Sequence, residues 1–104
     1  MVVKWKAKVY MKENLTRKAF ADYWLNTHAP LVKKMPGVKK YIINLVLSTD
    51  GEEPGYQGTA ELWFDTLEAM QLAVETPEGQ RAVADTQNFM RTFTSMVIEE
   101  QVVI

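Results

Sequence analysis

The chain of 104 residues has no cysteine and a single histidine. Without cysteine, disulfide scaffolds, CxxC redox sites and thiolate metal centres are excluded. One histidine excludes histidine-rich metal clusters and a catalytic pair of histidines within one chain. The GxGxxG, P-loop, GxSxG and HExxH motifs are also missing. We therefore expect neither a metal ion nor a cofactor.

Long apolar runs are missing as well, and no stretch is long enough to cross a bilayer. Lysines interrupt the apolar residues near the N-terminus at every second position, so we do not expect a signal peptide there. We expect a cytoplasmic protein without a membrane partner. With 47% hydrophobic and 24% charged residues, the composition is typical of a globular protein, and the length favours one domain over residues 1–104.

Charge is distributed unevenly along the chain. Residues 1–40 contain ten of the twelve basic residues, and residues 41–104 contain eleven of the thirteen acidic ones. Such a split occurs in nucleic-acid-binding proteins, and it also arises when two halves of one fold neutralise each other. The lysines have strand and helix-surface spacing rather than forming a basic tail. This favours the second interpretation, so we expect no nucleic-acid partner; an RNA-binding sheet is the weaker alternative.

Hydrophobic periodicity predicts four strands and two helical regions. The predicted strands are residues 2–12, 38–48, 56–64 and 92–103. The first helical region begins after the N-cap Thr16 and ends or kinks near Pro30, which lacks a backbone N–H, with a short continuation to Met35. Thr66 caps a second region to about Glu75. It restarts at Thr76-Pro77 and runs to about Asn88; a loop spans residues 50–55.

The order β-α-β-β-α-β predicts an α+β, ferredoxin-like fold. It is a four-stranded antiparallel sheet, ordered 4-1-3-2, with the helices on one face. The other face would mix aromatic and β-branched residues with charges of both signs, which suits a homodimer joined through its sheet faces. We expect this face to carry Lys4, Lys6, Lys8, Thr59, Glu61, Trp63, Val97, Glu99 and Val103.

A distinctive motif, F-x-x-Y-W-x-x-x-H-x-P-L, runs from Phe20 to Leu31. Together with Met35-Pro36-Gly37, Tyr41 and a later Asp85-x-x-x-Phe89, it resembles the EthD family of the dimeric α/β-barrel superfamily. Members are associated with degradation of ethyl tert-butyl ether, lactone isomerisation and pigment or polyketide pathways, and superfamily relatives include cofactor-free monooxygenases and haem enzymes. The resemblance implies a dimeric oxidoreductase, isomerase or lyase, or a binding protein of the same fold.

His28 is the main candidate for acid–base chemistry, because histidine is the side chain whose ordinary pKa lies near neutrality. We expect its ring in a solvent-reachable cavity between helix and sheet, on the same side as Tyr41. Backbone carbonyls freed by Pro30 would orient one ring nitrogen and leave the other for a ligand. The alternative is a structural histidine bonded to those carbonyls; the resemblance favours the functional role.

Tyr41 and Asp85 are the other candidate catalytic residues. If the side of the strand that carries Tyr41 and Ile43 faces the helices, the tyrosine hydroxyl would donate to a substrate carbonyl or phenolate. Otherwise it is a half-buried tyrosine with its hydroxyl in water. Asp85 would hold the histidine tautomer or act as a base. The alternative is a surface acid paired with Arg81, four residues earlier.

Large apolar side chains are expected either to line a pocket for a flat apolar ligand or to fill the core. They are Trp24, Met35, Phe64, Phe89 and Phe93.

Two functions compete on this basis. The first is a small enzyme that acts without a cofactor on a hydrophobic, oxygenated small molecule, by proton transfer, isomerisation, dehydration or monooxygenation. The second is a non-catalytic protein of the same fold that binds such a molecule or escorts it to a partner enzyme. The two differ in whether a ligand or ordered water lies within hydrogen-bond reach of His28 and a second polar group in a closed cavity.

Overall fold

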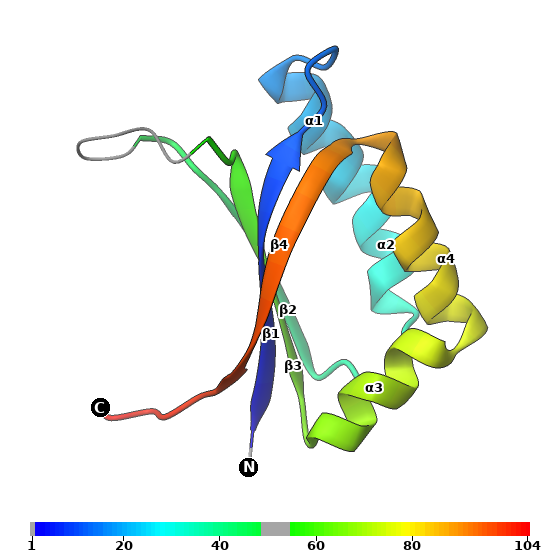
Figure 1. Cartoon of the computed structure of the whole chain (residues 1–104), viewed down its shortest axis with the longest axis vertical. Helices are drawn as coiled ribbons and strands as arrows, with labels where there is room; N and C mark the ends of the chain where they lie inside the picture. The colour runs from blue at the N-terminus through cyan, green and yellow to red at the C-terminus, as the bar shows by residue number, and fades with distance from the viewer. Residues whose placement is uncertain (1, 49–54) are drawn as a thin grey trace.

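The computed structural model describes residues 2–48 and 55–104. An antiparallel sheet forms one layer and the helices form the other, so one sheet face is covered and the opposite face is bare (Figure 1). The strands are β1 (Val3–Met11), β2 (Lys40–Leu45), β3 (Gly58–Phe64) and β4 (Met90–Glu99). The helical elements are α1 (Arg17–Tyr23), the π-helix η1 (Trp24–His28), α2 (Ala29–Lys33), α3 (Leu67–Glu75), α4 (Pro77–Asp85) and the 3-10 turn η2 (Thr86–Asn88).

The sheet order is β2-β3-β1-β4, which confirms the predicted order and the ferredoxin-like α+β fold. In the centre of the sheet, Ala7 of β1 lies opposite Ala60 of β3 and Ser95 of β4. The helices cover the face that carries Ala7 and Val9, and small residues at the sheet centre leave room for Phe20 and Trp24 of the first helix. Full burial of such a side chain contributes roughly 1.5–3 kcal/mol.

The first helix does not end at Pro30 but changes its winding just before it. Across η1 the N–H of Ala29 donates to the carbonyl of Trp24, five residues back. In a regular α-helix the ring of Pro30 would clash with the carbonyl of Asn26, and a wider turn separates the two. The helix then continues as α2. The sequence predicted an end or a kink here, and the structure has a widened turn that carries Trp24 and His28.

Threonine caps begin each helical region, as predicted. The side-chain oxygen of Thr16 accepts from the N–H of Ala19, and that of Thr66 accepts from the N–H of Ala69. Thr76 ends α3 and begins α4, because its hydroxyl donates to the carbonyl of Ala73 while its oxygen accepts from the next helix. These two short helices form a bent cover over the sheet beside β4 (Figure 1).

The face assignment of β4 was wrong for two residues. Val97 lies opposite Trp5 and Glu99 opposite Val3, so both belong to the helix-covered side. Met96 and Ile98 take the outer side instead. The reason is that β4 carries apolar residues on both of its faces, so the alternation within the strand does not determine which of its side chains face the helices. Pairing with β1 does.

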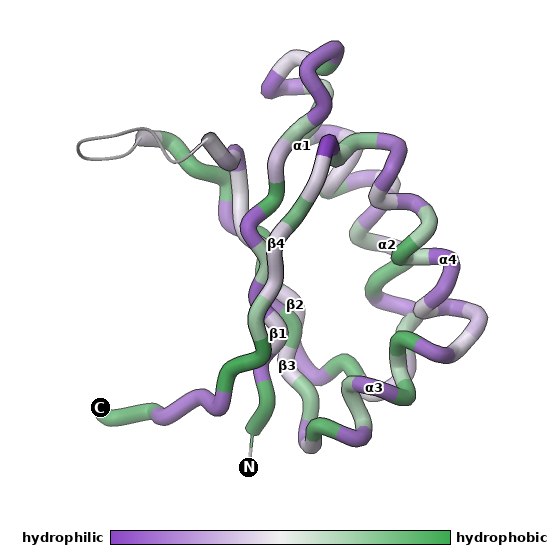
Figure 2. Tube along the Cα trace, in the orientation of Figure 1, coloured by the Kyte–Doolittle hydropathy of each residue, from purple (hydrophilic) through white to green (hydrophobic). Residues whose placement is uncertain are grey.

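The last strand is also shorter than predicted and ends at Glu99. Its pairing with β1 stops where β1 begins at Val3, because no further partner strand continues there. Val103 therefore lies in an exposed tail instead of on the sheet. The tail leaves the body toward the bare side of the sheet, and Figure 2 colours its end as hydrophobic. Of the predicted loop over residues 50–55, residues 50–54 lie outside the described part of the chain.

Candidate functional site

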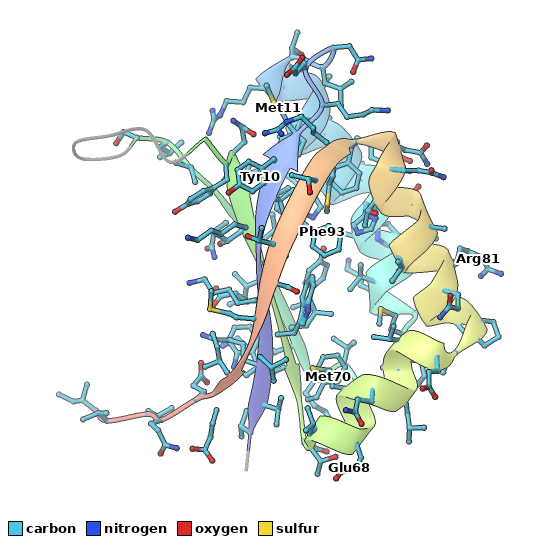
Figure 3. The ribbon with its side chains drawn as sticks, viewed as in Figure 1. Tyr10, Met11, Glu68, Met70, Arg81 and Phe93 are labelled. Carbon is cyan, nitrogen blue, oxygen red and sulfur yellow. The ribbon has the colours of Figure 1, made fainter. Side chains whose placement is uncertain are left out.

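A cavity of about 430 Å³ lies between the sheet and the helices. Its walls are mainly apolar and come from all four strands, η1, α2, α3 and α4. Phe93 of β4 and Met70 of α3 point into this space from opposite sides, whereas Arg81 points away from it (Figure 3). The size falls within the range of small-molecule pockets, roughly 300–1,000 Å³. Its two most enclosed polar side chains are His28 and Tyr41.

His28 lines this cavity and pairs with the partly buried Asp85 behind it. The Nδ1 atom of His28 lies 2.8 Å from the Oδ2 atom of Asp85, and the histidine is only 5% exposed. The two residues are far apart in the chain and meet because the end of α4 packs against η1. The ring of His28 also contacts that of Phe89, with 4.8 Å between centroids.

The carboxylate of Asp85 accepts two further hydrogen bonds, both at its other oxygen. The hydroxyl of Tyr23 donates at 2.7 Å, and the side-chain amide of Asn88 donates at 3.0 Å. Burial raises the pKa of Asp85, but these hydrogen bonds together with that of His28 outweigh burial and lower the pKa below its ordinary value. Asp85 is therefore ionised at neutral pH.

His28 is held as a neutral imidazole in one tautomer. Burial lowers its pKa, and the opposing attraction of Asp85 does not fully offset this effect. Because the ionised Asp85 can only accept, the proton of the neutral ring resides on Nδ1. The lone pair of the ring is then on Nε2. In the described part of the chain Nε2 has no hydrogen-bonding partner, and no fully buried side-chain nitrogen lacks one, so Nε2 is open to the cavity.

Tyr41 supplies a hydrogen-bond donor to the same cavity. Its oxygen accepts from the indole Nε1 of Trp24 at 3.2 Å, which leaves the hydroxyl proton free to point elsewhere. Burial raises the pKa of Tyr41 to about 12, so the phenol stays protonated at neutral pH. Trp24 and His28 are both in η1, so one widened turn places the group that orients Tyr41 and the basic nitrogen on the same wall.

The structure brings the three proposed catalytic residues to one region. The ring of His28 is oriented by the carboxylate of Asp85, one of the roles suggested for that residue, and not by the backbone carbonyls freed by Pro30. Asp85 pairs with His28, and no ion pair to Arg81 is found within the described residues. Of the five predicted lining residues, Trp24, Met35, Phe64 and Phe93 border the cavity. Phe89 does not, because it is fully buried behind the rings of Phe20, Trp24 and His28.

Sequence reasoning missed Tyr23 and Asn88 as partners of Asp85. Tyr23 belongs to the F-x-x-Y-W motif and lies five residues before His28, so the motif itself contained a signal. Asn88 lies three residues after Asp85, at the spacing that joins side chains on one helical face. The contact of Tyr23 with Asp85 crosses from α1 to the end of α4, so spacing alone could not have paired these two residues.

The fold and the cavity define a ferredoxin-like α+β domain with a mainly apolar cavity between its sheet and its helices. The EthD domain family matches residues 12–92, and the chain belongs to this family. It is 32% identical over 83 residues to an uncharacterised 11.0 kDa protein encoded in the thcB–thcC intergenic region of Rhodococcus erythropolis, covering 80% of this chain and 81% of that one.

Solved structures share the fold over nearly the full chain. An EthD family protein from Bacillus halodurans has a TM-score of 0.86 at 30% identity, covering 97% of this chain and all (100%) of that one. A dimeric ferredoxin-like protein from Thermobifida fusca has a TM-score of 0.74 at 14% identity (94% and 90% covered). The hydroxynitrile lyase of Passiflora edulis has a TM-score of 0.79 at 14% identity, covering 97% of this chain and 96% of that one.

Two other kinds of site were sought in the described residues. Over 2–48 and 55–104, no three histidine, aspartate or glutamate side chains converge in a way that would hold a metal ion. In the same ranges, no helix has both the length and the apolar character needed to cross a membrane.

Proposed function

We propose that this protein is a small enzyme that moves a proton on a hydrophobic, oxygenated small molecule, with His28 as the general base. The observation that carries the proposal is the tautomer of His28: Nδ1 is held by the ionised Asp85, and Nε2 faces an apolar cavity. A neutral imidazole with a free lone pair is the form that a base at neutral pH requires.

The proposed step is the enolisation of a carbonyl compound. Nε2 of His28 removes a proton from the carbon next to the carbonyl, and the electron pair of that C–H bond forms the C=C bond of an enolate. The enolate oxygen accepts a hydrogen bond from the protonated Tyr41. Asp85 stabilises the imidazolium formed at His28. Where the substrate has a further C=C bond conjugated with the enolate, return of the proton to the γ-carbon shifts the double bond and completes an isomerisation, and no oxidant or reductant is needed.

Deuterium exchange tests this proposal without knowledge of the natural product. The protein is incubated in D₂O with methyl 2-naphthyl ketone, and uptake of deuterium at the methyl group is followed by NMR. We expect exchange above the buffer rate. The His28→Gln variant should reduce the enzymatic rate by about 10²–10⁴-fold, the usual effect of losing one acid–base group.

A matched control separates loss of the base from loss of the fold. Gln80→Ala changes an exposed residue of α4 outside the cavity and should retain the exchange rate of the wild type. Ketone binding without any exchange in the wild type would contradict the enzymatic proposal and favour a binding or escort protein. Equal exchange by wild type and His28→Gln would contradict the assignment of the base.

We also propose that two copies associate through the outer faces of their sheets. This face carries the lysines of β1 and is bare in the single chain (Figure 1). It is partly apolar, because it carries the indole of Trp63. The ammonium groups of Lys4 and Lys40 lie 5.2 and 4.9 Å from the centre of this ring. The C-terminal tail, which contains the exposed Val102 and Val103, runs toward the same side (Figure 1). A second sheet would cover these apolar groups.

A further inference from the structure

The cavity differs from the rest of the molecule in its charge. The chain has twelve lysine and arginine residues, yet none of them lines the cavity in the described structure. The lysines of β1 lie on the outer face of the sheet, and Arg81 points away from the cavity (Figure 3). Lys12 and Arg91 border a more open hollow at the start of β4, which shares Thr86, Met90 and Phe93 with the cavity. Within the described residues, the cavity walls themselves therefore carry no cationic side chain that could pair with a ligand.

The charges that do lie near the cavity are negative. Glu75 is on the lining, and Asp85 stands directly behind the ring of His28. His28 adds no compensating charge, because its lowered pKa keeps it neutral. An anionic ligand would lose its hydration without gaining a counter-ion, which is strongly unfavourable in an apolar site.

The same residues disfavour a cationic ligand. Both oxygens of Asp85 are occupied, by His28 on one side and by Tyr23 and Asn88 on the other. Glu75 is exposed and keeps its own hydration. The exposed rim of the cavity is mainly apolar: Val74, Val83, Phe93 and Val97 contribute to it, and Gln71 and Glu75 are its exposed polar members.

We infer that the substrate is an uncharged carbonyl compound with an apolar body and a hydrogen on the carbon next to the carbonyl, such as a ketone, aldehyde or lactone, and that carboxylates and amines are rejected. This inference rests on the proposed function and specifies its substrate class. The apolar rim and walls receive the hydrocarbon part. The Tyr41 hydroxyl meets the oxygen and Nε2 of His28 meets the acidic hydrogen, so no charged group on the ligand is needed.

Three probes with the same naphthalene body test the inference: methyl 2-naphthyl ketone, 2-naphthoate and 1-(2-naphthyl)ethylamine. Binding is measured at pH 7.5 from the shift of the imidazole NMR signals of His28, which are unambiguous because it is the sole histidine. We expect the ketone to bind at least about tenfold more tightly than either charged probe. Binding of the naphthoate or the amine as tight as that of the ketone would overturn the inference, as would binding of none of the three.

A charge variant sharpens the test. Val97→Lys places a cation on the rim, and we expect the affinity for 2-naphthoate to rise by about tenfold. Leu72→Lys adds the same charge to the exposed side of α3, outside the cavity, and should leave it unchanged. An equal gain from both variants would overturn the inference, because net charge would then explain it.

The two proposals fail in different ways. If the ketone binds preferentially but no deuterium is exchanged, the enzymatic function fails and the preference for uncharged ligands holds. If exchange depends on His28 but 2-naphthoate binds as tightly as the ketone, the base is supported and the substrate class is wrong.

Discussion

Burial and hydrogen bonding act in opposite directions on the pKa of His28. Burial disfavours the imidazolium, whereas Asp85 favours it, and burial is the larger effect. Tyr23 and Asn88 donate hydrogen bonds to the carboxylate of Asp85. These bonds stabilise its negative charge and weaken its effect on the pKa of His28. The pKa of His28 thus depends, through Asp85, on Tyr23 and Asn88, neither of which lines the cavity.

The lowered pKa of His28 predicts how stability depends on pH. Because the unfolded chain binds this proton more readily than the folded one, stability is full above the ordinary histidine pKa of about 6.5 and falls as the pH drops below it. We expect the free energy of unfolding in urea to decrease between pH 7 and 5. His28→Gln should lack this decrease; an identical slope in both proteins would contradict a depressed histidine pKa.

Tyr23 is expected to act as a positioning residue through Asp85. Tyr23→Phe keeps the ring that packs on Phe89 but removes a donor to the carboxylate. With one hydrogen bond fewer, the carboxylate of Asp85 should interact more strongly with the imidazolium and raise the pKa of His28. An NMR titration of the one imidazole measures this. Tyr10→Phe, on the outer face, is the matched control, and a lowered or unchanged pKa in Tyr23→Phe would refute the role.

At the scale of elements, the site depends on how closely η1 approaches the sheet. The indole of Trp24 lies directly over the backbone of Gly58 in β3, where a Cβ atom would be only 2.6 Å from the ring and 2.7 Å from the carbonyl oxygen of Asn44. Only glycine fits at this position. The contact places the Nε1 atom of Trp24 at the hydroxyl of Tyr41.

Gly58→Ala is therefore expected to destabilise the protein by about 1–3 kcal/mol, the usual cost of overpacking a core. For a domain of this size, each kcal/mol lowers the melting temperature by roughly 4–8 °C. Differential scanning calorimetry measures the change. Thr59→Ala, the next residue on the outer face, loses only its hydrogen bond with Asn44 and should cost about 1 kcal/mol or less. Equal melting temperatures for Gly58→Ala and the wild type would contradict the close packing.

At the scale of the whole molecule, one sheet face is covered by helices and the other carries a mixture of lysines and apolar groups. We expect a homodimer that persists at moderate salt, because apolar burial rather than ion pairing would drive it. Met96→Lys introduces a charge on the outer face of β4 and should shift sedimentation at micromolar concentration toward the monomer. Leu72→Lys, on the helical side, should leave the dimer intact, and a monomeric wild type would refute the interface.

Local patterns in the sequence determined most of the fold. The alternation of lysine with apolar residues defined β1 and its two faces, and the threonine N-caps placed the starts of the helices. These features depend on neighbours within a few residues, which is why they could be predicted. The F-x-x-Y-W-x-x-x-H-x-P-L motif identified the family for the same reason, since its residues share one continuous helical segment.

Tertiary structure alone decided what the candidate site can do. The phase of β4 followed from its pairing with β1, since its own sequence is apolar on both faces. The pairing of Asp85 with His28, and its satisfaction by Tyr23, arise where α4 meets the first helix. No spacing rule links groups on separate helices. The tautomer and the charge of the histidine depend on burial and on partners distant in the chain, and both exist only once the helices have packed on the sheet.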